Sequence, residues 1–234
     1  NNVSGNYIGL FQNGQPPAAP PLVGVAVSAD ASGTIIGGDA AGAGNVISGL
    51  QVGIALIGSR GSKGQGNFIG IDPVGNVAVP NQVSGILLTH SSDNTIGGAT
   101  ALARNIIAGN TGYGILLTDT PDASGLPPTA STIPTKNNVI QGNYIGTNKA
   151  GATALGNLVG VFLAIGADSN TVGGTAAGAG NVISGNRLSG ILIGRPTVQG
   201  ADLRDNTIQG NKIGTATDGK APLPNGGDGI QIFA

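Results

Sequence analysis

Apolar residues recur along this chain as alternating pairs, each introduced by a glycine. An alternation of period two is typical of a β-strand that turns one side toward a core and the other toward solvent. The pattern predicts seven short strands that start at Gly24, Gly53, Gly85, Gly114, Gly160, Gly190 and Gly229. Their inward pairs are Val25/Val27, Ile54/Leu56, Ile86/Leu88, Ile115/Leu117, Val161/Leu163, Ile191/Ile193 and Ile230/Ile232.

Two further short strands are expected before each of these strands, and their inward residues form two more columns. One has inward positions at Val3, Ile36, Gly64, Ile96, Ile140, Val172 and Ile208. The other starts with an asparagine and places an isoleucine two residues later, at Ile8, Ile47, Ile69, Ile107, Ile145, Ile183 and Ile213. The chain therefore contains seven units of three strands each.

Strands this short are not stable alone, so the units must stack on one another. Equivalent strands are connected by a whole unit, which makes their pairing parallel and favours a right-handed path. We predict an all-β fold, a right-handed parallel β-helix (a solenoid) of about seven three-strand coils, with residues 1–234 as a single domain.

The asparagine column is interpreted as a structural ladder. Stacked side-chain amides at a corner can hydrogen-bond along the rod, and asparagine tolerates the left-handed backbone of a bend. The ladder comprises Asn6, Asn45, Asn67, Asn105, Asn143, Asn181 and Asn211. Ligand binding by the same column is the alternative. The glycines should likewise serve corners that need a positive φ.

An outward column follows the asparagines and contains Tyr7, Phe68 and Tyr144, together with Lys212. Aromatic rings suit the apolar faces of sugars, so this column is a candidate ligand-binding surface. The alternative is packing beneath the loops, because Val46, Ile106 and Val182 alternate with the rings. Loops are expected at residues 10–23, 39–44, 71–84, 99–104, 147–159, 175–180 and 215–228, with further insertions at residues 118–136 and 194–204.

Composition narrows the classes of partner. The net charge is −1, and the ten basic residues are scattered, so we predict no nucleic-acid partner. No apolar run approaches the roughly 20 residues that span a bilayer, so no membrane insertion is expected. The chain has no cysteine, which excludes disulfides and thiolate metal sites. We expect no metal and no cofactor.

Strings such as NNVIQGNYIGT, GADSNTVGGTAAGAGNVISGN and SGILIG resemble the repeats of right-handed parallel β-helix proteins of the pectate-lyase-like superfamily. They are most similar to repetitive regions of large bacterial extracellular or surface proteins. The superfamily includes polysaccharide lyases, glycoside hydrolases and uronate epimerases. The resemblance implies catalytic Asp/Glu clusters that this chain does not match: it has no glutamate, and its single histidine, His90, stands in Thr-His-Ser rather than Gly-His-Gly.

Other candidate carboxylates are poorly spaced for catalysis. Asp93 and Asp205 share one column but lie three coils apart, about 14 Å, which is too far for paired acid–base work. Asp119 and Asp122 lie in one predicted loop and are candidates for half of the ligands of a calcium site. The preferred interpretation is that both are solvated loop carboxylates. We therefore predict no catalytic residues.

The sequence favours a non-catalytic structural or adhesive module of a secreted or cell-surface protein. The chain starts inside a first strand and stops after a third strand with no visible cap, so we expect a fragment of a longer solenoid or a protomer that self-associates through its open ends. The alternative is a carbohydrate-binding or polysaccharide-degrading β-helix protein, with a polysaccharide partner.

Overall fold

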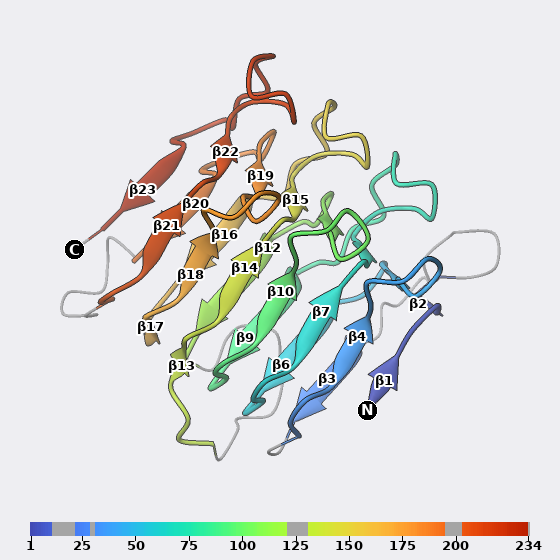
Figure 1. Cartoon of the computed structure of the whole chain (residues 1–234), viewed down its shortest axis with the longest axis vertical. Coiled ribbons are helices and arrows are strands. Elements are labelled where there is room, and N and C mark those ends of the chain that lie inside the picture. The colour runs from blue at the N-terminus through green and yellow to red at the C-terminus, as the bar shows by residue number, and fades with distance from the viewer. Residues whose placement is uncertain (11–21, 29–30, 121–130, 195–202, 234) are drawn as a thin grey trace.

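The computed structural model describes residues 1–10, 22–28, 31–120, 131–194 and 203–233. Within these residues the chain winds through three parallel sheets of seven strands each (Figure 1). Every sheet contributes one strand to each coil, and we number the coils one to seven along the chain. The prediction of an all-β parallel β-helix of about seven coils is confirmed.

The strands are short, and each sheet stacks one of them from every coil. Sheet A contains β1 (Asn2–Val3), β4 (Ile35–Gly37), β7 (Lys63–Gln65), β10 (Thr95–Gly97), β14 (Val139–Gln141), β18 (Thr171–Gly173) and β21 (Thr207–Gln209). Sheet B contains β2 (Tyr7–Ile8), β5 (Val46–Ile47), β8 (Phe68–Ile69), β11 (Ile106–Ile107), β15 (Tyr144–Ile145), β19 (Val182–Ile183) and β22 (Lys212–Ile213). Sheet C contains β3 (Val23–Ser28), β6 (Val52–Ile57), β9 (Ser84–Thr89), β12 (Tyr113–Thr118), β16 (Val159–Leu163), β20 (Ile191–Ile193) and β23 (Ile230–Ile232). A small additional pair joins β13 (Thr135–Lys136) to β17 (Ala167–Asp168).

Aliphatic side chains of successive coils lie over one another in the interior. Ile107 pairs in register with Ile69 on one side and Ile145 on the other, and Ile145 pairs in turn with Ile183. These four side chains are fully buried in one core cluster, and Ile213 packs against the same cluster. The predicted inward columns of all three strands therefore share one interior, except at the end of the rod, where the predicted inward residues Ile230 and Ile232 are exposed.

Gly64 is the one inward position of sheet A without a side chain. It pairs with Ile36 and Ile96, and a Cβ built on it meets only the Cδ1 of Ile96, at 3.5 Å. Its φ is not positive, so alanine fits both the space and the backbone. Because glycine loses more backbone entropy on folding, we expect Gly64→Ala to stabilise the protein by about 0.5–1 kcal/mol, measured by chemical denaturation. A loss of stability would show that this part of the interior is fully packed.

The glycines at the start of the third strands correct one expectation. None of the seven has a positive φ, so a bend does not require them. They are required by close approach: a Cβ on Gly85 would lie 2.8 Å from the carbonyl oxygen of Gly114 and 3.0 Å from the Cγ2 of Ile107. A stacked column of glycines therefore lets the backbones of neighbouring coils pass closely at this corner.

Left-handed backbone occurs at other positions. Between sheets C and A, one column of six residues has φ between 54° and 63°: Gly33, Gly61, Asp93, Asn137, Ser169 and Asp205. The asparagines of the predicted ladder do not have positive φ, so that expectation was wrong. In coils one, three, five and seven the preceding glycine takes the left-handed conformation instead, at Gly5, Gly66, Gly142 and Gly210.

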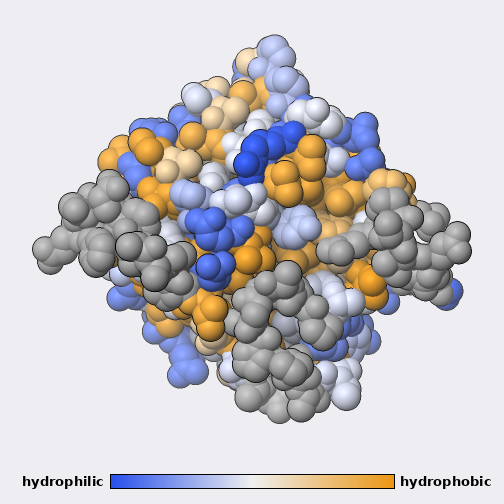
Figure 2. Space-filling model, turned by 180° about the vertical axis from the view of Figure 1, so that it is seen from behind, coloured by the Kyte–Doolittle hydropathy of each residue, from blue (hydrophilic) through white to orange (hydrophobic). Residues whose placement is uncertain are grey.

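In the middle coils, the outward side of sheet C is apolar and buried, contrary to the expectation that it faces solvent, whereas Ala26 at one end of the sheet is exposed. Leu87, Leu116 and Phe162 are 1–3% exposed and form a second cluster with their neighbours. The rings of Tyr113 and Phe162 lie 5.2 Å apart within it. On the side seen from behind, apolar and polar residues are interspersed at the surface (Figure 2). In the described part of the chain, no helix has the length and hydropathy needed to cross a membrane.

Candidate functional site

The predicted asparagine column is a continuous hydrogen-bonded ladder along the corner between sheets A and B. The Nδ2 of each asparagine donates to the Oδ1 of the asparagine in the next coil at 2.9–3.0 Å, from Asn6 through to Asn211. The same Nδ2 of Asn143 also donates to the carbonyl oxygen of Ile96, at 2.9 Å. The five asparagines between the two ends are 0–1% exposed, so their amides serve one another and the backbone.

Two further ladders occupy the other two corners and were missed in the sequence. Between sheets B and C, each Nδ2 donates to the next Oδ1 along Asn81, Asn110, Asn157, Asn186 and Asn225. Between sheets C and A, the same bonds join Asn94, Asn138, Asn170 and Asn206. The sequence does contain a pattern for the ladder between sheets C and A. One of its asparagines directly precedes each Thr-Ile, Val-Ile or Thr-Val pair of the sheet A strands in coils four to seven.

The outward aromatic column lies on sheet B as predicted. Pairing places Tyr7, Phe68 and Tyr144 in one row with Val46, Ile106, Val182 and Lys212. The aliphatic members are 3–8% exposed, whereas Tyr7 is 64% exposed and the other two rings are half-buried. The row therefore has rings in coils one, three and five, a lysine in coil seven and buried aliphatic side chains in the even coils.

Two cations lie over the rings of this row. The guanidinium carbon of Arg104 is 4.2 Å from the centroid of Tyr144, and the Nε of Arg104 donates to the carbonyl oxygen of Gly142 at 3.2 Å. The ammonium nitrogen of Lys149 is 5.6 Å from the centroid of Phe68. Such contacts are favourable because the ring face is electronegative. Arg104 of coil four therefore contacts the next coil, and Lys149 of coil five reaches back two coils to Phe68 of coil three.

Two rows of loops flank the outer face of sheet B. Residues 39–44, 99–104 and 175–180 form the even-coil loops, and residues 71–79, 147–154 and 215–222 form the odd-coil loops. The odd-coil loops contact one another: Lys149 N–H donates to the Gly75 carbonyl at 2.9 Å, and Thr217 N–H donates to the Gly151 carbonyl at 3.2 Å. The loops after β15 and β22 project from one side of the rod (Figure 1). We call the surface between the two rows the sheet-B groove.

Two depressions lie along the sheet-B groove. The first, of about 360 Å³, is lined by Phe68, Ile106, Leu102, Arg104 and Lys149 together with glycines and alanines of the even-coil loops. The second, of about 300 Å³, is lined by Tyr144, Val182, Arg104, Lys212 and Thr217 and by similar small residues. Arg104 belongs to both depressions. The candidate residues Phe68 and Tyr144 therefore lie in one continuous surface, whereas Tyr7 lines neither depression.

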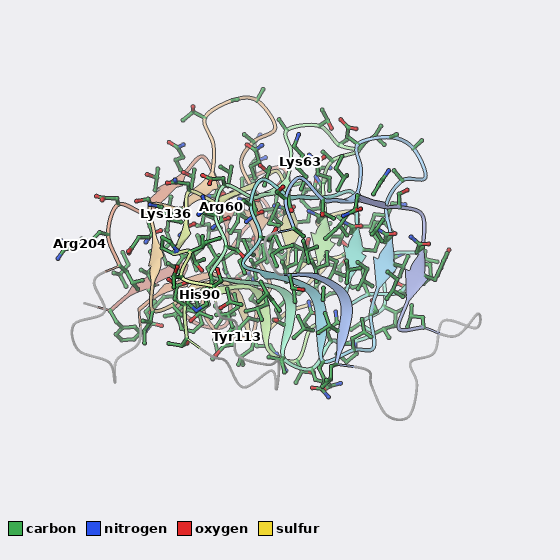
Figure 3. The ribbon with its side chains drawn as sticks, turned by 90° about the horizontal axis from the view of Figure 1, so that it is seen from below. Arg60, Lys63, His90, Tyr113, Lys136 and Arg204 are labelled. Carbon is green, nitrogen blue, oxygen red and sulfur yellow. The ribbon has the colours of Figure 1, made fainter. Side chains whose placement is uncertain are left out.

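Four other cations are labelled in Figure 3: Arg60, Lys63, Lys136 and Arg204. Lys63 is the exposed first residue of β7, on sheet A. These cations lie on or beside other parts of the rod, and none of them lines either depression.

His90 and Asp119 meet at the neck of the insertion that starts at Thr118. The Asp119 carboxylate accepts hydrogen bonds from His90 N–H at 3.2 Å and from Thr135 N–H at 3.1 Å, and it also accepts one from the Thr135 hydroxyl. The Nδ1 of His90 lies 3.7 Å from Asp119 and 3.2 Å from the carbonyl oxygen of Ile133. The carboxylate thus closes the insertion. Asp122, the other carboxylate of the suggested calcium half-site, lies outside the described residues.

Asp72 organises the first odd-coil loop. Its Oδ1 accepts hydrogen bonds from the N–H groups of Gly75, Asn76 and Val77 at 2.7–3.0 Å. Burial opposes ionisation, but the backbone donors outweigh it and lower the pKa of Asp72.

The lowered pKa of Asp72 makes this loop sensitive to acid. A carboxyl with a lowered pKa stabilises the fold fully above its unfolded pKa, near 3.9, and this contribution is lost as the pH falls through the folded pKa. We expect the unfolding midpoint in denaturant to fall less steeply for Asp72→Ala than for the wild type between about pH 5 and pH 2. Parallel curves for the two proteins would contradict the assignment.

Asp93 and Asp205 share a backbone column, and Asp93 accepts a hydrogen bond from Asn137 Nδ2 at 3.3 Å.

Among the described residues, no group of three or more histidines and carboxylates is placed to hold a metal ion. Comparisons with protein families, curated proteins and solved structures found no match to this chain. The sheet-B groove is therefore described by its own chemistry alone.

Proposed function

We propose that this chain is a non-catalytic structural or adhesive segment of a secreted or cell-surface protein, a rigid rod whose ends join further β-helical coils. The observation that carries the proposal is the continuity of the aliphatic columns and of the asparagine ladder from Asn6 to Asn211, together with the two shorter ladders that run from coils three and four to coil seven. A fold whose buried polar groups form hydrogen bonds between neighbouring coils resists bending and unwinding.

The polarity of the ladders supports end-to-end contact. Each asparagine donates to the asparagine of the following coil. The last asparagine therefore has no following asparagine as an acceptor, and the first has no preceding asparagine as a donor. Among the described residues, the N–H groups of Asn206, Asn211 and Asn225 have no hydrogen-bond acceptor, and the Oδ1 of Asn6 has no donor. The exposed Ile230 and Ile232 at the same end offer apolar side chains for stacking. An unpaired strand edge of this kind is a template for another coil.

Concentration-dependent assembly of the 234-residue chain tests the proposed end-to-end contact. We expect sedimentation and negative-stain electron microscopy to show rods whose length grows with concentration. Asn211→Arg should reduce this growth because it places a charged, bulky side chain at the end of the ladder. The matched control Thr95→Arg puts the same side chain on the outer face of sheet A in coil four and should leave growth unchanged. A chain that stays monomeric at all concentrations would refute end-to-end stacking.

The non-catalytic part of the proposal has a separate test. Purified chain should show no turnover in a lyase and hydrolase screen on acidic and neutral polysaccharides. Turnover that is lost in Asp119→Ala, with the fold retained by circular dichroism, would overturn it in favour of a polysaccharide-degrading enzyme.

A further inference from the structure

Odd and even coils differ at the corner between sheets A and B. Each even coil has one of the even-coil loops directly before its ladder asparagine. In each odd coil only two residues separate the inward residue of sheet A from that asparagine, as Ser4 and Gly5 do in coil one. The two types alternate along the rod, and coil seven is of the odd type. The type of a following coil therefore decides which groups meet coil seven at this corner.

Each odd coil bonds to the even coil after it in the same way. The N–H of the glycine before the odd coil's ladder asparagine donates to the carbonyl oxygen of the alanine at the next-to-last position of the even-coil loop. The bonds run from Gly5 to Ala43 at 2.9 Å, from Gly66 to Ala103 at 3.1 Å and from Gly142 to Ala179 at 2.9 Å. Because coils one, three and five all make this bond, it is a regular feature of an odd-to-even junction.

Gly210 of coil seven has the same backbone conformation but no such partner. Its φ is 68°, compared with 69–70° at the three equivalent glycines. Among the described residues, no group accepts a hydrogen bond from the exposed Gly210 N–H. The donor is therefore already oriented for an alanine carbonyl of a following even coil, and binding requires no change of backbone there.

The odd-coil loops show the same two-coil period. The carbonyl oxygen of Gly75 accepts a hydrogen bond from the loop of coil five, and that of Gly151 accepts one from the loop of coil seven. The corresponding carbonyl in coil seven is that of Gly219, and no N–H of the described residues donates to it. A continuation in phase therefore places an even coil next to coil seven and an odd coil after it.

A second copy of this chain matches coil seven only in part. Its coil one can continue the ladder, because the Oδ1 of Asn6 has no donor and can accept the N–H of Asn211. Coil one is of the odd type, however, and has no even-coil loop to place over Gly210. An even coil provides both acceptors, so it forms the more complete junction.

We propose that the coil-seven face binds a β-helical segment that begins with an even-type coil, in preference to coil one of a second copy. The partner is recognised by a Gly-Gly-x-x-x-x-Ala-x-Asn loop, whose alanine carbonyl pairs with Gly210. It also carries an asparagine at each corner, as coils four and six do, to accept the N–H groups of Asn206, Asn211 and Asn225. This inference rests on the proposed function, in which the ends of the rod join further coils, and it specifies which coil fits.

Extension of the whole chain by one coil tests the proposal. One protein carries a second copy of residues 166–194 after Ala234, which adds an even-type coil, and the matched control carries a second copy of residues 59–89, which adds an odd-type coil. Amide hydrogen exchange followed by NMR is measured at Gly210 and at Asn211. We expect the even extension to slow exchange at both amides by at least about tenfold relative to the unextended chain. The odd extension should slow it only at Asn211, because it supplies a ladder asparagine without an even-coil loop.

The unextended chain provides a second measurement that does not depend on the folding of an added coil. In concentrated samples that have assembled into rods, exchange should slow at Asn211 and stay fast at Gly210. Equal protection of the two amides in these rods, equal protection of Gly210 by both extensions, or no protection of Gly210 by the even extension would overturn the preference for an even coil. Unprotected Asn211 in every sample would refute the joining of coils itself, and this inference with it.

Discussion

Asn143→Ala is expected to lower the free energy of unfolding by about 4 kcal/mol. The substitution removes two hydrogen bonds donated by Nδ2, to Ile96 and Asn181, and two accepted by Oδ1 from Asn105. Asn143 is fully buried, so the groups left behind have no access to water. Each hydrogen bond contributes about 1 kcal/mol, and an unsatisfied buried group costs about 1–3 kcal/mol. Equilibrium unfolding in guanidinium chloride measures the loss.

Asn6→Ala is the matched control for this effect. Asn6 occupies the first position of the same ladder, but it is exposed and donates through its Nδ2 only to Asn45 and Ser4. Water can replace both partners, so we expect a loss of about 1 kcal/mol or less. Equal losses in the two variants would mean that burial of the ladder contributes nothing to its strength.

Gly114→Ala is expected to destabilise the protein by about 3 kcal/mol. A Cβ at this position would lie 2.5 Å from the carbonyl oxygen of Gly160, 2.9 Å from the Nδ2 of Asn157 and 3.1 Å from the Cγ2 of Ile145. Two of these contacts involve the backbone and a ladder amide, which cannot move without breaking hydrogen bonds. Overpacking of a rigid interior typically costs about 1–3 kcal/mol. Thermal and chemical unfolding of the variant measure the effect.

The stability change of Gly64→Ala serves as the comparison for Gly114→Ala. It separates the effect of close approach between neighbouring backbones from the effect of replacing any strand glycine by alanine. Both glycines are buried strand residues without positive φ, and the two substitutions add the same methyl group. Only Gly114 faces a neighbouring carbonyl. The two variants should therefore change stability in opposite directions. Destabilisation of similar size in both would show that the stacked glycine column has no special role.

The repeat itself was readable because identical columns stack in register. An isoleucine two residues after each ladder asparagine fixed the second strand, and the Gly-apolar-x-apolar pattern located the third to within one residue. Such periodic signals depend only on local alternation and on equal spacing between coils. They are sufficient for the fold class and for the outward row that contains Phe68 and Tyr144.

Other features depend on contacts between distant segments and could not be derived from local patterns. The approach of Lys149 to Phe68 joins residues from coils five and three, and Arg104 reaches Tyr144 from the preceding coil. The buried outer face of sheet C also escaped prediction, because alternation alone assigns one side of a strand to solvent whether or not other parts of the chain cover it. The two missed ladders are a different case, because their asparagines were visible in the sequence. These asparagines do not recur in every coil, so the repeat did not reveal them.

Methyl–methyl nuclear Overhauser effects in isoleucine-labelled protein test the stacked interior most directly. Ile107, Ile145 and Ile183 lie far apart in sequence but are neighbours in consecutive coils and fully buried. Strands of adjacent coils are about 4.8 Å apart, so strong cross-peaks are expected between Ile107 and Ile145 and between Ile145 and Ile183. Cross-peaks that connect each isoleucine only to residues of its own coil would contradict the parallel β-helix and, with it, both proposals about function.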